Sequence, residues 1–445
     1  MSSLPASVPY LVVGAGVHGL STAWHLAAQL AATGKGSGAD VLVVDKSGPG
    51  AGATGIACGC VRNLYMTREL HPILRHSVDV WQSDPITLGF QQVGYVAAGT
   101  AAQIPDYEVM VDSHNACGYR SQMFTGAEAR RFLKGLWPDF KTDGVEVVLH
   151  EKPSGYAGTA QAVRGLVQKC AEHGVAIRSG VAVTGYDVTN GRVAAVHTDQ
   201  GTIRADCVIL CAGAWVGRHW AWLGEPMRLT KRCAAGNLVE GADMWTFWRL
   251  REGEVYHDRP YRTADDREPP VLHVELLDTP VRHPETGAVL QESLYVYFKN
   301  GAERMDRPGL QGGSVPIRLG PEAEVEPYGH ANDRYQAEPD FADLLTTAMG
   351  MLMTRFEGSR SRFRARRNGG IGAFTPDNIP IFDWVKDNLY LIADSNHGFK
   401  MIGVGKLVAD QLVAGRDVAE LKPFRMRRFA EGRTFGRHNS TSPWV

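Results

Sequence analysis

Three glycines near the amino terminus have the types and spacing that bind a dinucleotide. Gly14, Gly16 and Gly19 form the pattern G-x-G-x-x-G directly after the apolar run 10–13. The first glycine allows a tight turn, the second lets the backbone approach a pyrophosphate, and the third lets a helix pack closely on a strand. Asp45 ends the next apolar run and is placed to accept a hydrogen bond from a ribose hydroxyl.

The elements that must position these residues follow in the right order. The segment after Gly19 places Leu26 and Leu30 on one face and predicts a helix, whose free N–H groups would face the phosphates. The alternative is a glycine-rich turn without a ligand, but strand, helix, strand and terminal acid together favour a nucleotide site. A glycine-rich loop at 33–38 makes the stretch before Asp45 longer than in a plain NAD-binding domain.

Length, charge and cysteine content exclude several classes of protein. The chain has 445 residues, enough for two domains, and its formal net charge of −1 gives no reason to expect nucleic acid or an anionic membrane as a partner. No apolar run is long enough for a membrane span, and the short polar start is unlike a secretory signal, so we expect a cytoplasmic protein. The cysteines predict reduced thiols rather than a metal site; they stand at 58, 60, 117, 170, 207, 211 and 233.

The region after Asp45 carries a second candidate ligand loop. Residues 46–55 are almost all small, which suits backbone that runs against a flat or phosphorylated ligand, although a flexible linker has the same composition. Arg62 follows, and its type alone leaves a surface ion pair and a ligand contact both open. Farther on, the strand predicted at 207–211 ends in the small residues 212–214, which indicates a return to the nucleotide sheet.

From about residue 226 the pattern changes to that of β-strands. Alternation places Tyr295, Tyr297 and Lys299 on one face of a strand, where a terminal lysine is usually a solvated edge. Residues 300–340 are rich in glycine and proline and predict a loop, and residues 341–356 predict a helix.

The last informative block repeats the order of strand, glycine-bearing loop and helix. The loop at 369–377 precedes a strand predicted at 389–393, and residues 396–400 lead into a helix predicted at 403–413. A chain that returns to its nucleotide sheet this late predicts a cofactor too large for one mononucleotide-binding half.

Together these blocks resemble the amine-oxidising branch of the D-amino acid oxidase superfamily, nearest the sarcosine oxidases and dimethylglycine dehydrogenases. The resemblance covers 9–62, 155–215 and 369–415, and the tail from 423 to 444 is similar to that family's ending. Its most specific parts are the motifs at 211–215, 375–377 and 397–400.

The resemblance implies an α/β fold in which an FAD-binding Rossmann-like domain contains an interposed, mainly antiparallel β substrate domain. It places the FAD-binding domain at 1–98, 150–225 and 365–418, the substrate domain at 99–149 and 226–364, and a C-terminal tail at 419–445.

Carried over position by position, the resemblance implies an FAD site built from both ends of the chain. The glycine pattern would meet the pyrophosphate, Asp45 the adenosine ribose, Val183 the adenine, and residues 397–400 the isoalloxazine ring. The cofactor-binding residues that it implies are Gly14, Ala15, Gly16, Val17, His18, Gly19, Asp45, Lys46, Ala53, Thr54, Val183, Ala212, Gly213, Trp215, Gly372, His397, Gly398, Phe399 and Lys400.

The resemblance also assigns catalytic roles to Arg62, Lys299 and Lys400. In the sarcosine oxidases, an arginine and a lysine at positions that match Arg62 and Lys400 clamp the substrate carboxylate, and Lys299 lies near a lysine that activates oxygen. The cysteine that holds flavin covalently in monomeric sarcosine oxidase would fall near Gly370, and the linking histidine of dimethylglycine dehydrogenases is absent around 56–58. These two departures predict noncovalent FAD.

The implied reaction is oxidation of the C–N bond of a secondary or tertiary amine of an amino acid to an imine, with reoxidation of the flavin by O2 and release of H2O2. One alternative is an amine dehydrogenase that passes electrons to a protein acceptor, as a subunit of a hetero-oligomer. Another is an FAD-bound structural or assembly protein without activity. The expected partners are a small-molecule amine or amino acid and O2 or another electron acceptor, with no nucleic acid, metal or membrane span.

Overall fold

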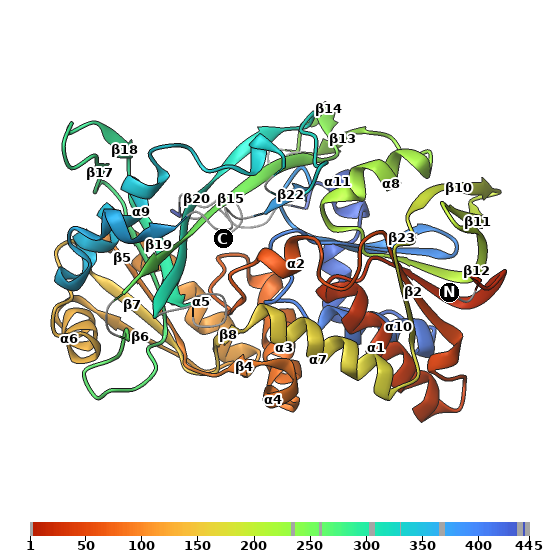
Figure 1. Ribbon diagram of the computed structural model, residues 1–445, viewed down its shortest axis with the longest axis horizontal. Helices are drawn as coiled ribbons and strands as arrows, with labels where there is room; N and C mark the ends of the chain where they lie inside the picture. The colour runs from red at the N-terminus through yellow and green to blue at the C-terminus, as the bar shows by residue number, and fades with distance from the viewer. Residues whose placement is uncertain are drawn as a thin grey trace.

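Two β-sheets of different kinds lie side by side in the protein (Figure 1). Within the described residues, the first sheet has eight strands around a parallel core, and the second has nine strands and is mainly antiparallel. This arrangement confirms the expected α/β fold class. The computed structural model describes residues 3–232, 236–257, 260–301, 308–329, 331–364, 370–433 and 439–440, so Cys233, Gly369 and the end of the tail lie outside it.

The eight-stranded sheet is centred on β1 (Ser7–Val13). This strand lies between β2 (Val41–Asp45) and β12 (Gly201–Leu210) and runs parallel to both. On the far side of β12 lies β24 (Leu389–Ala393), and on the far side of β2 lies β9 (Ala176–Ser179), both parallel to their neighbours. The late returns to the nucleotide sheet that the sequence predicts are therefore confirmed. The remaining strands of this sheet are β10 (Val183–Thr189), β11 (Arg192–Thr198) and β23 (Ile381–Lys386).

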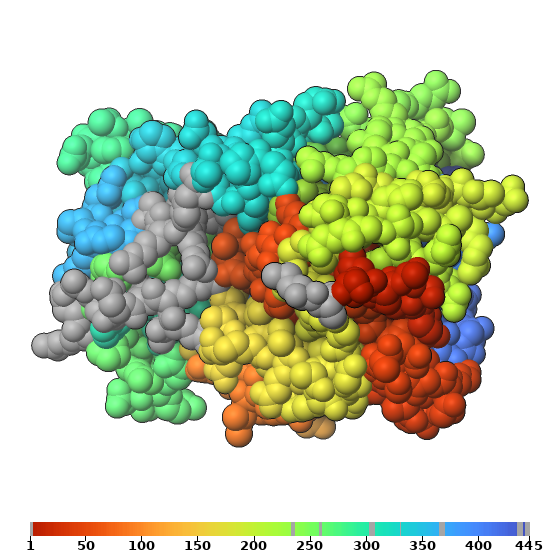
Figure 2. Space-filling view, turned by 45° about the vertical axis from the view of Figure 1, so that its right-hand side comes forward, coloured from red at the N-terminus to blue at the C-terminus, as the bar shows by residue number. Residues whose placement is uncertain are grey.

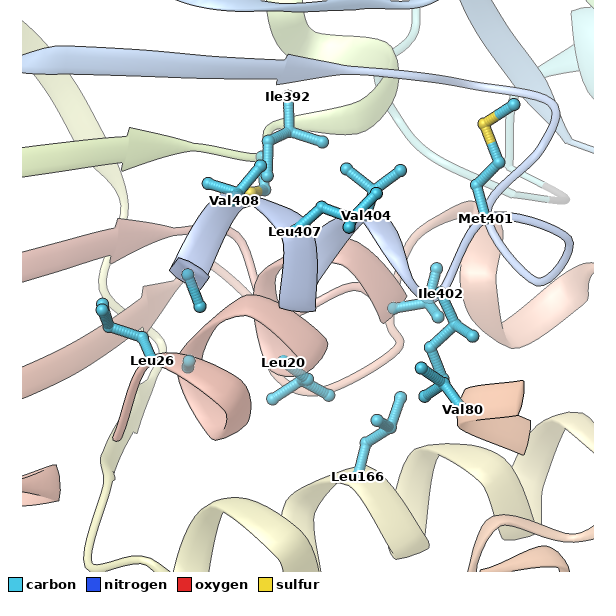
Figure 3. Close-up of a cluster of buried hydrophobic side chains, with 14 of the residues drawn as sticks. Leu20, Leu26, Val80, Leu166, Ile392, Met401, Ile402, Val404, Leu407 and Val408 are labelled. Atoms are coloured by element: carbon cyan, nitrogen blue, oxygen red, sulfur yellow. The ribbon is translucent and has the colours of Figure 1, made fainter. Parts of the chain in front are cut away.

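Helices cover this sheet and enclose an apolar core. Helix α1 (Val17–Thr33) packs against α10 (Val404–Ala414) and α7 (Thr159–Glu172), as Figure 3 shows for side chains from all three. The contact between α1 and α10 is so close that a Cβ on Gly405 would lie 2.5 Å from the backbone nitrogen of Thr22. In the space-filling view, α7 (yellow) lies on the surface beside the amino-terminal segments (red) (Figure 2).

The nine-stranded sheet forms the other half of the protein. All its neighbouring strands are antiparallel except β16 and β5. In sheet order its strands are β21 (Phe363–Arg364), β15 (Thr246–Tyr256), β20 (Gly309–Gly320), β19 (Leu294–Asn300), β16 (Val271–Leu276), β5 (Tyr95–Gly99), β7 (Val147–Glu151) and β6 (Ser121–Thr125), and β22 (Ile371–Phe374) pairs with β15.

The prediction of a loop throughout 300–340 is wrong, because β20 is a long strand inside the sheet. Gly312 and Gly313 within it are required by packing rather than by a turn. A Cβ on Gly312 would overlap the carbonyl oxygen of Tyr297, and a Cβ on Gly313 would lie 2.5 Å from the Tyr297 hydroxyl. Glycine in a strand interior marks such a close approach.

Alternation along β19 is as the sequence predicts. Leu294, Val296 and Phe298 are buried in a cluster with α9 (Phe341–Leu352), which covers that face of the sheet. The helix predicted to reach residue 356 ends at Leu352, because Met353 is extended and a short 3-10 turn follows.

The other elements of the described residues are three small sheets and several helices. The short strands are β3 (Cys60–Val61), β4 (Phe90–Gln91) and β8 (Gly155–Ala157), the pair β13 (Arg228–Arg232) and β14 (Leu238–Asp243), and the pair β17 (Val281–Arg282) and β18 (Val289–Gln291). The other helices are α2 (Ala53–Ile56), α3 (His71–Ser83), α4 (Pro85–Leu88), α5 (Ile104–Ala116), α6 (Gly126–Leu136), α8 (Val216–Trp222) and α11 (Arg427–Glu431).

The expected domain boundaries near 98 and 150 fall inside strands of the nine-stranded sheet. β5 ends at Gly99 and β7 begins at Val147, and both strands pair within that sheet. No helix in the described part of the chain is both long enough and apolar enough to cross a membrane.

Candidate functional site

A cavity of about 460 Å³ lies where the carboxyl ends of the parallel strands meet the nine-stranded sheet. Open α/β sheets bind ligands at this edge. Most of the predicted site residues line the cavity. These are Gly14, Gly16, Val17, His18, Asp45, Lys46, Ala53, Thr54, Arg62, Val183, Ala212, Gly213, Trp215, Gly398, Phe399 and Lys400.

The glycine pattern forms the turn that the sequence predicts. Gly14 has a φ of 105°, and a Cβ there would overlap the carbonyl oxygen of Cys211. A Cβ on Gly19 would overlap the carbonyl oxygen of Gly14, so this glycine serves the packing of α1 and does not line the cavity. No side chain caps α1 at Gly16, and Thr54 Oγ1 accepts a hydrogen bond from Val17 N at 3.0 Å.

The carboxylate of Asp45 fixes two turns at the end of β2. It accepts hydrogen bonds from the backbone nitrogens of Ala15 (2.8 Å), Ser47 (2.8 Å) and Gly48 (2.7 Å). The contact of Ala15 with the site is therefore made through Asp45, and its own atoms do not line the cavity.

Residues 321–329, which the sequence did not indicate as part of the site, also contribute to the cavity near the end of β2. Lys46 forms an ion pair with Glu326 and lies 3.8 Å from the centre of the Trp215 ring. Trp215 Nε1 also donates to Glu326, at 2.7 Å, and Tyr328 packs against the same indole. Nothing in the composition of 321–329 marks these two residues as site residues.

Arg62 and Lys400 approach the cavity from opposite ends of the chain; Arg62 is buried and Lys400 is half-buried. Arg62 is 6% exposed, donates to the carbonyl oxygen of Leu64 at 2.5 Å, and lies over the rings of Tyr65 and Tyr95. A surface ion pair, the alternative that its type left open, is therefore wrong. Burial, and then the charge of Arg62, lowers the pKa of Lys400 to about 8.

The loop after β24 carries a buried carboxylate between two histidines. Asp394 accepts from His18 Nε2 at 2.9 Å and from His397 Nδ1 at 2.8 Å. Burial alone would raise the pKa of Asp394, but His397 and His18 hold it well below its usual range, whereas burial lowers the pKa of His397. His397 was expected to contact the cofactor, but it is not among the residues that line the cavity; Asp394, its hydrogen-bond partner, lines the cavity instead.

Gly372 is also set back from the cavity. A Cβ there would lie 2.7 Å from the Cβ of Ser395, so the glycine allows β22 to approach the loop after β24. Ser395 lines the cavity in its place.

Lys299 is buried rather than solvated, with 5% of its surface exposed. Its Nζ donates to the carbonyl oxygen of Asn300 at 2.9 Å and lies 4.4 Å from the centre of the Tyr156 ring. Lys299 is not among the residues that line the cavity, so its position over a flavin stays a prediction.

The nine-stranded sheet supplies a tyrosine-rich wall. Tyr295 and Tyr297 line the cavity, as do Tyr95 and Glu252, and the Tyr297 hydroxyl donates to Glu252 Oε1 at 2.8 Å. The sequence placed the two tyrosines of β19 on one face, but it gave no sign of which face meets the ligand. Asp394 could have been found, because it ends an apolar strand in the same way as Asp45.

Comparison with known proteins agrees with this geometry. The family described as "DAO: FAD dependent oxidoreductase" matches residues 10–411. The chain is 30% identical over 217 residues to the 4-methylaminobutanoate oxidase (formaldehyde-forming) of Paenarthrobacter nicotinovorans, a match that covers 48% of this chain and 25% of that protein. It is 26% identical over 226 residues to the mitochondrial sarcosine dehydrogenase of Mus musculus, covering 48% of this chain and 23% of that protein. The chain thus spans about a quarter of the length of these curated relatives.

Solved structures share the whole fold. L-proline dehydrogenase from P. horikoshii has a TM-score of 0.72 to this chain, with 17% sequence identity over 96% of this chain and 99% of that one. The family match spans nearly the entire sequence and includes both ends of the cavity. The chain therefore belongs to the FAD-dependent oxidoreductase (DAO) family, and FAD and oxidoreductase are the cofactor and enzyme class of that family.

Proposed function

We propose that the protein oxidises the C–N bond of a secondary or tertiary amine carried by an amino acid, with noncovalent FAD as cofactor. The observation that carries this proposal is the convergence of Arg62 and Lys400 on one cavity. Arg62 is buried, Lys400 is half-buried, and their like charges repel, so an anion bound near both is favoured. A carboxylate suits them, because the guanidinium fork binds two oxygens and the ammonium adds a compact charge.

The residues present fit FAD. Gly14 and Gly16 leave backbone exposed to the cavity at the amino end of α1, and a Cβ on Gly16 would lie 3.1 Å from Thr54 Oγ1. The side-chain nitrogen of Asn396 is buried at the cavity and has no hydrogen-bond partner among the described residues. An acceptor on a bound ligand would satisfy it. When bound, FAD supplies the two-electron oxidation of the amine.

The chain's own residues bind and orient the substrate. Arg62 and Lys400 hold its carboxylate, and the wall of Tyr295 and Tyr297 excludes water from the other side. Glu252 lies in the same cavity and is near enough to Lys400 for their charges to interact. Its carboxylate can take the proton that an ammonium group must lose before the amine is oxidised. The 4-methylaminobutanoate oxidase that the chain resembles acts on a molecule with both groups, an amine and a carboxylate.

An anaerobic amine screen tests the proposal. Holoenzyme is mixed with N-methyl amino acids and with the matching decarboxylated amines, and loss of flavin absorbance is followed. Each charge-assisted hydrogen bond contributes roughly 1.5–3 kcal/mol, so Arg62→Lys and Lys400→Met should weaken binding of the amino acid by about ten- to a hundredfold. The decarboxylated amine should be affected much less. Arg75→Lys, at a surface ion pair with Asp79, is the control. Equal weakening of both ligands would show that the two residues hold structure or flavin.

A dehydrogenase that passes electrons to another protein is the second candidate. It is favoured by the similarity to a sarcosine dehydrogenase and by the position of Lys299 outside the cavity lining. Rapid formation of H2O2 by the purified chain with amine and air would exclude it, and slow reoxidation that an artificial acceptor accelerates would support it.

A further inference from the structure

Two cysteines that are separated by one residue lie in the wall of the cavity. Cys58 and Cys60 both line it, and their exposed fractions are only 6% and 7%. Gly59 between them has a φ of 74°, which turns the chain, and a Cβ there would overlap the carbonyl oxygen of Ala157. The turn at Gly59 places two cysteines, one residue apart, in the wall of the same cavity.

The surroundings of this pair favour one thiolate and one thiol. Cys60 is the cross-strand partner of Tyr156, whose ring lies 4.4 Å from Lys299 Nζ. Cys58 Sγ lies 4.0 Å from the carbonyl oxygen of Gln311, the cross-strand partner of Lys299. The nearby Cys58 thiol, together with the charges of Lys299 and Lys400, lowers the pKa of Cys60 to about 7, whereas the interaction with Cys60 and burial raise the pKa of Cys58.

We propose that Cys58 and Cys60 are a redox-active pair that hydrogen peroxide oxidises to a disulfide, which reversibly inhibits the enzyme. The proposal rests on the proposed oxidase function for the source of the peroxide, since H2O2 formed in this cavity meets the two sulfurs before it reaches solvent. Reactive cysteines lie in electropositive, partly accessible sites, and the cavity wall beside two lysines is such a site.

The chemistry balances with peroxide as the only oxidant. The Cys60 thiolate attacks one oxygen of H2O2, the O–O bond breaks, hydroxide leaves, and Cys60 becomes a sulfenic acid. The sulfur of Cys58 then attacks the sulfenic sulfur. The S–S bond forms as the S–O bond breaks, and the hydroxyl leaves as water with the Cys58 proton.

Oxidation would change the substrate site because the pair adjoins Arg62. Cys60 and Val61 form β3, and Arg62 follows directly. A disulfide across one residue must tighten the turn at Gly59 and so shift the start of β3. We expect oxidised enzyme to lose a carboxylate contact of Arg62, with a loss of about tenfold or more in affinity for the amino acid.

Peptide mass spectrometry of the holoenzyme provides the test. Trypsin releases both cysteines in the single peptide 47–62. After one or a few equivalents of added H2O2, we expect this peptide to lose two hydrogens and to carry no alkylated thiol, and dithiothreitol should restore both thiols. In Cys58→Ser, dimedone should trap a sulfenic acid on Cys60, whereas Cys60→Ser should give no adduct. Cys117→Ser, which removes a half-buried thiol elsewhere, should respond as the unaltered enzyme does.

Two outcomes would overturn the proposal. One is a peptide 47–62 that keeps both thiols after the added peroxide has been consumed, and the other is equal trapping on Cys58 in Cys60→Ser. Because peroxide is added, this readout does not depend on amine oxidation. If the disulfide forms with added peroxide but not during turnover with amine and air, the redox pair stands and the oxidase function fails. In the double variant Cys58→Ser/Cys60→Ser, peroxide treatment should leave the rate of flavin reduction at its untreated value, whatever that value is.

Discussion

Lys400 gives the site a pH dependence of its own. Burial, and then the charge of Arg62, lowers the pKa of its ammonium to about 8, so Lys400 is charged below that pH and loses its proton as the pH rises through it. We therefore expect affinity for a carboxylate ligand to fall between about pH 7 and pH 9.

The measurement uses a carboxylic acid that carries no amine, so that the ligand itself does not titrate in this range, and follows the ligand's perturbation of the flavin spectrum. Lys400→Arg keeps the charge at all these pH values and should remove the dependence. An unchanged profile in Lys400→Arg would assign the titration to another group.

Lys299 is the residue whose role most needs a kinetic test. If it stabilises negative charge that develops on oxygen, Lys299→Met should slow reoxidation by O2 far more than reduction by substrate. Stopped-flow measurement of the two half-reactions separates these effects. Equal slowing of both would mean that this buried lysine supports the cavity wall through Tyr156 and Asn300 instead.

At the scale of elements, the crossing of α1 over β1 should control cofactor retention. A Cβ on Gly19 would overlap the carbonyl oxygen of Gly14, so Gly19→Ala must push α1 away from the turn that we expect to hold the pyrophosphate. We expect purified Gly19→Ala to contain little FAD and to unfold at lower temperature. Gly185→Ala, in β10 where a Cβ meets nothing within 4 Å, is the matched control and should keep its flavin. If purified Gly19→Ala retains all its FAD, α1 adjusts to the added methyl group without disturbing the turn at Gly14.

Local signals were enough to predict some elements but not others. The parallel strands and the face of β19 follow from periodicity, because each depends on near neighbours in sequence. β20 could not be predicted, since Gly312 and Gly313 are explained only by close contacts with the adjacent strands, at Tyr297 of β19 and Arg251 of β15. Glu326 and Tyr328 were missed for the same reason. They reach the cavity through contacts with Trp215, more than a hundred residues away.

For the molecule as a whole, buried histidines predict a loss of stability in mild acid. Burial lowers the pKa of His25, His71 and His219 to about 3 and that of His114 to about 4. In the unfolded chain these groups bind protons near pH 6.5, so the stabilisation is complete above that pH and is lost as the pH falls toward the folded values. Each group should cost on the order of 2 kcal/mol of folding free energy by pH 5.

Denaturant unfolding at several pH values measures this loss. His25→Gln removes one titrating group, so its stability should depend less steeply on pH than that of the unaltered protein, whatever its starting value. If the stabilities of His25→Gln and of the unaltered protein change with pH in parallel, His25 does not contribute to the acid loss of stability.

The attachment of the cofactor is a property of the whole holoenzyme. Because the linking residues of the related covalent enzymes are missing, acid precipitation should release yellow flavin into the supernatant. Colour that stays in the pellet would reveal a covalent bond, and tryptic mapping of the coloured peptide would locate it.

The order of strands in the eight-stranded sheet has a consequence for synthesis on the ribosome. The neighbour of β1, β12, pairs with β24, which is translated more than 370 residues after β1. Until β24 emerges, the apolar edge of β12 at Val208–Leu210 stays open, and Asp394 to Lys400 are not yet present to complete the cavity. Nascent chains with open strand edges and long-range pairings fold slowly and aggregate. We expect a chain arrested before residue 389 to bind chaperones and no flavin, so that the cofactor can join only after residues 389–400 have been made.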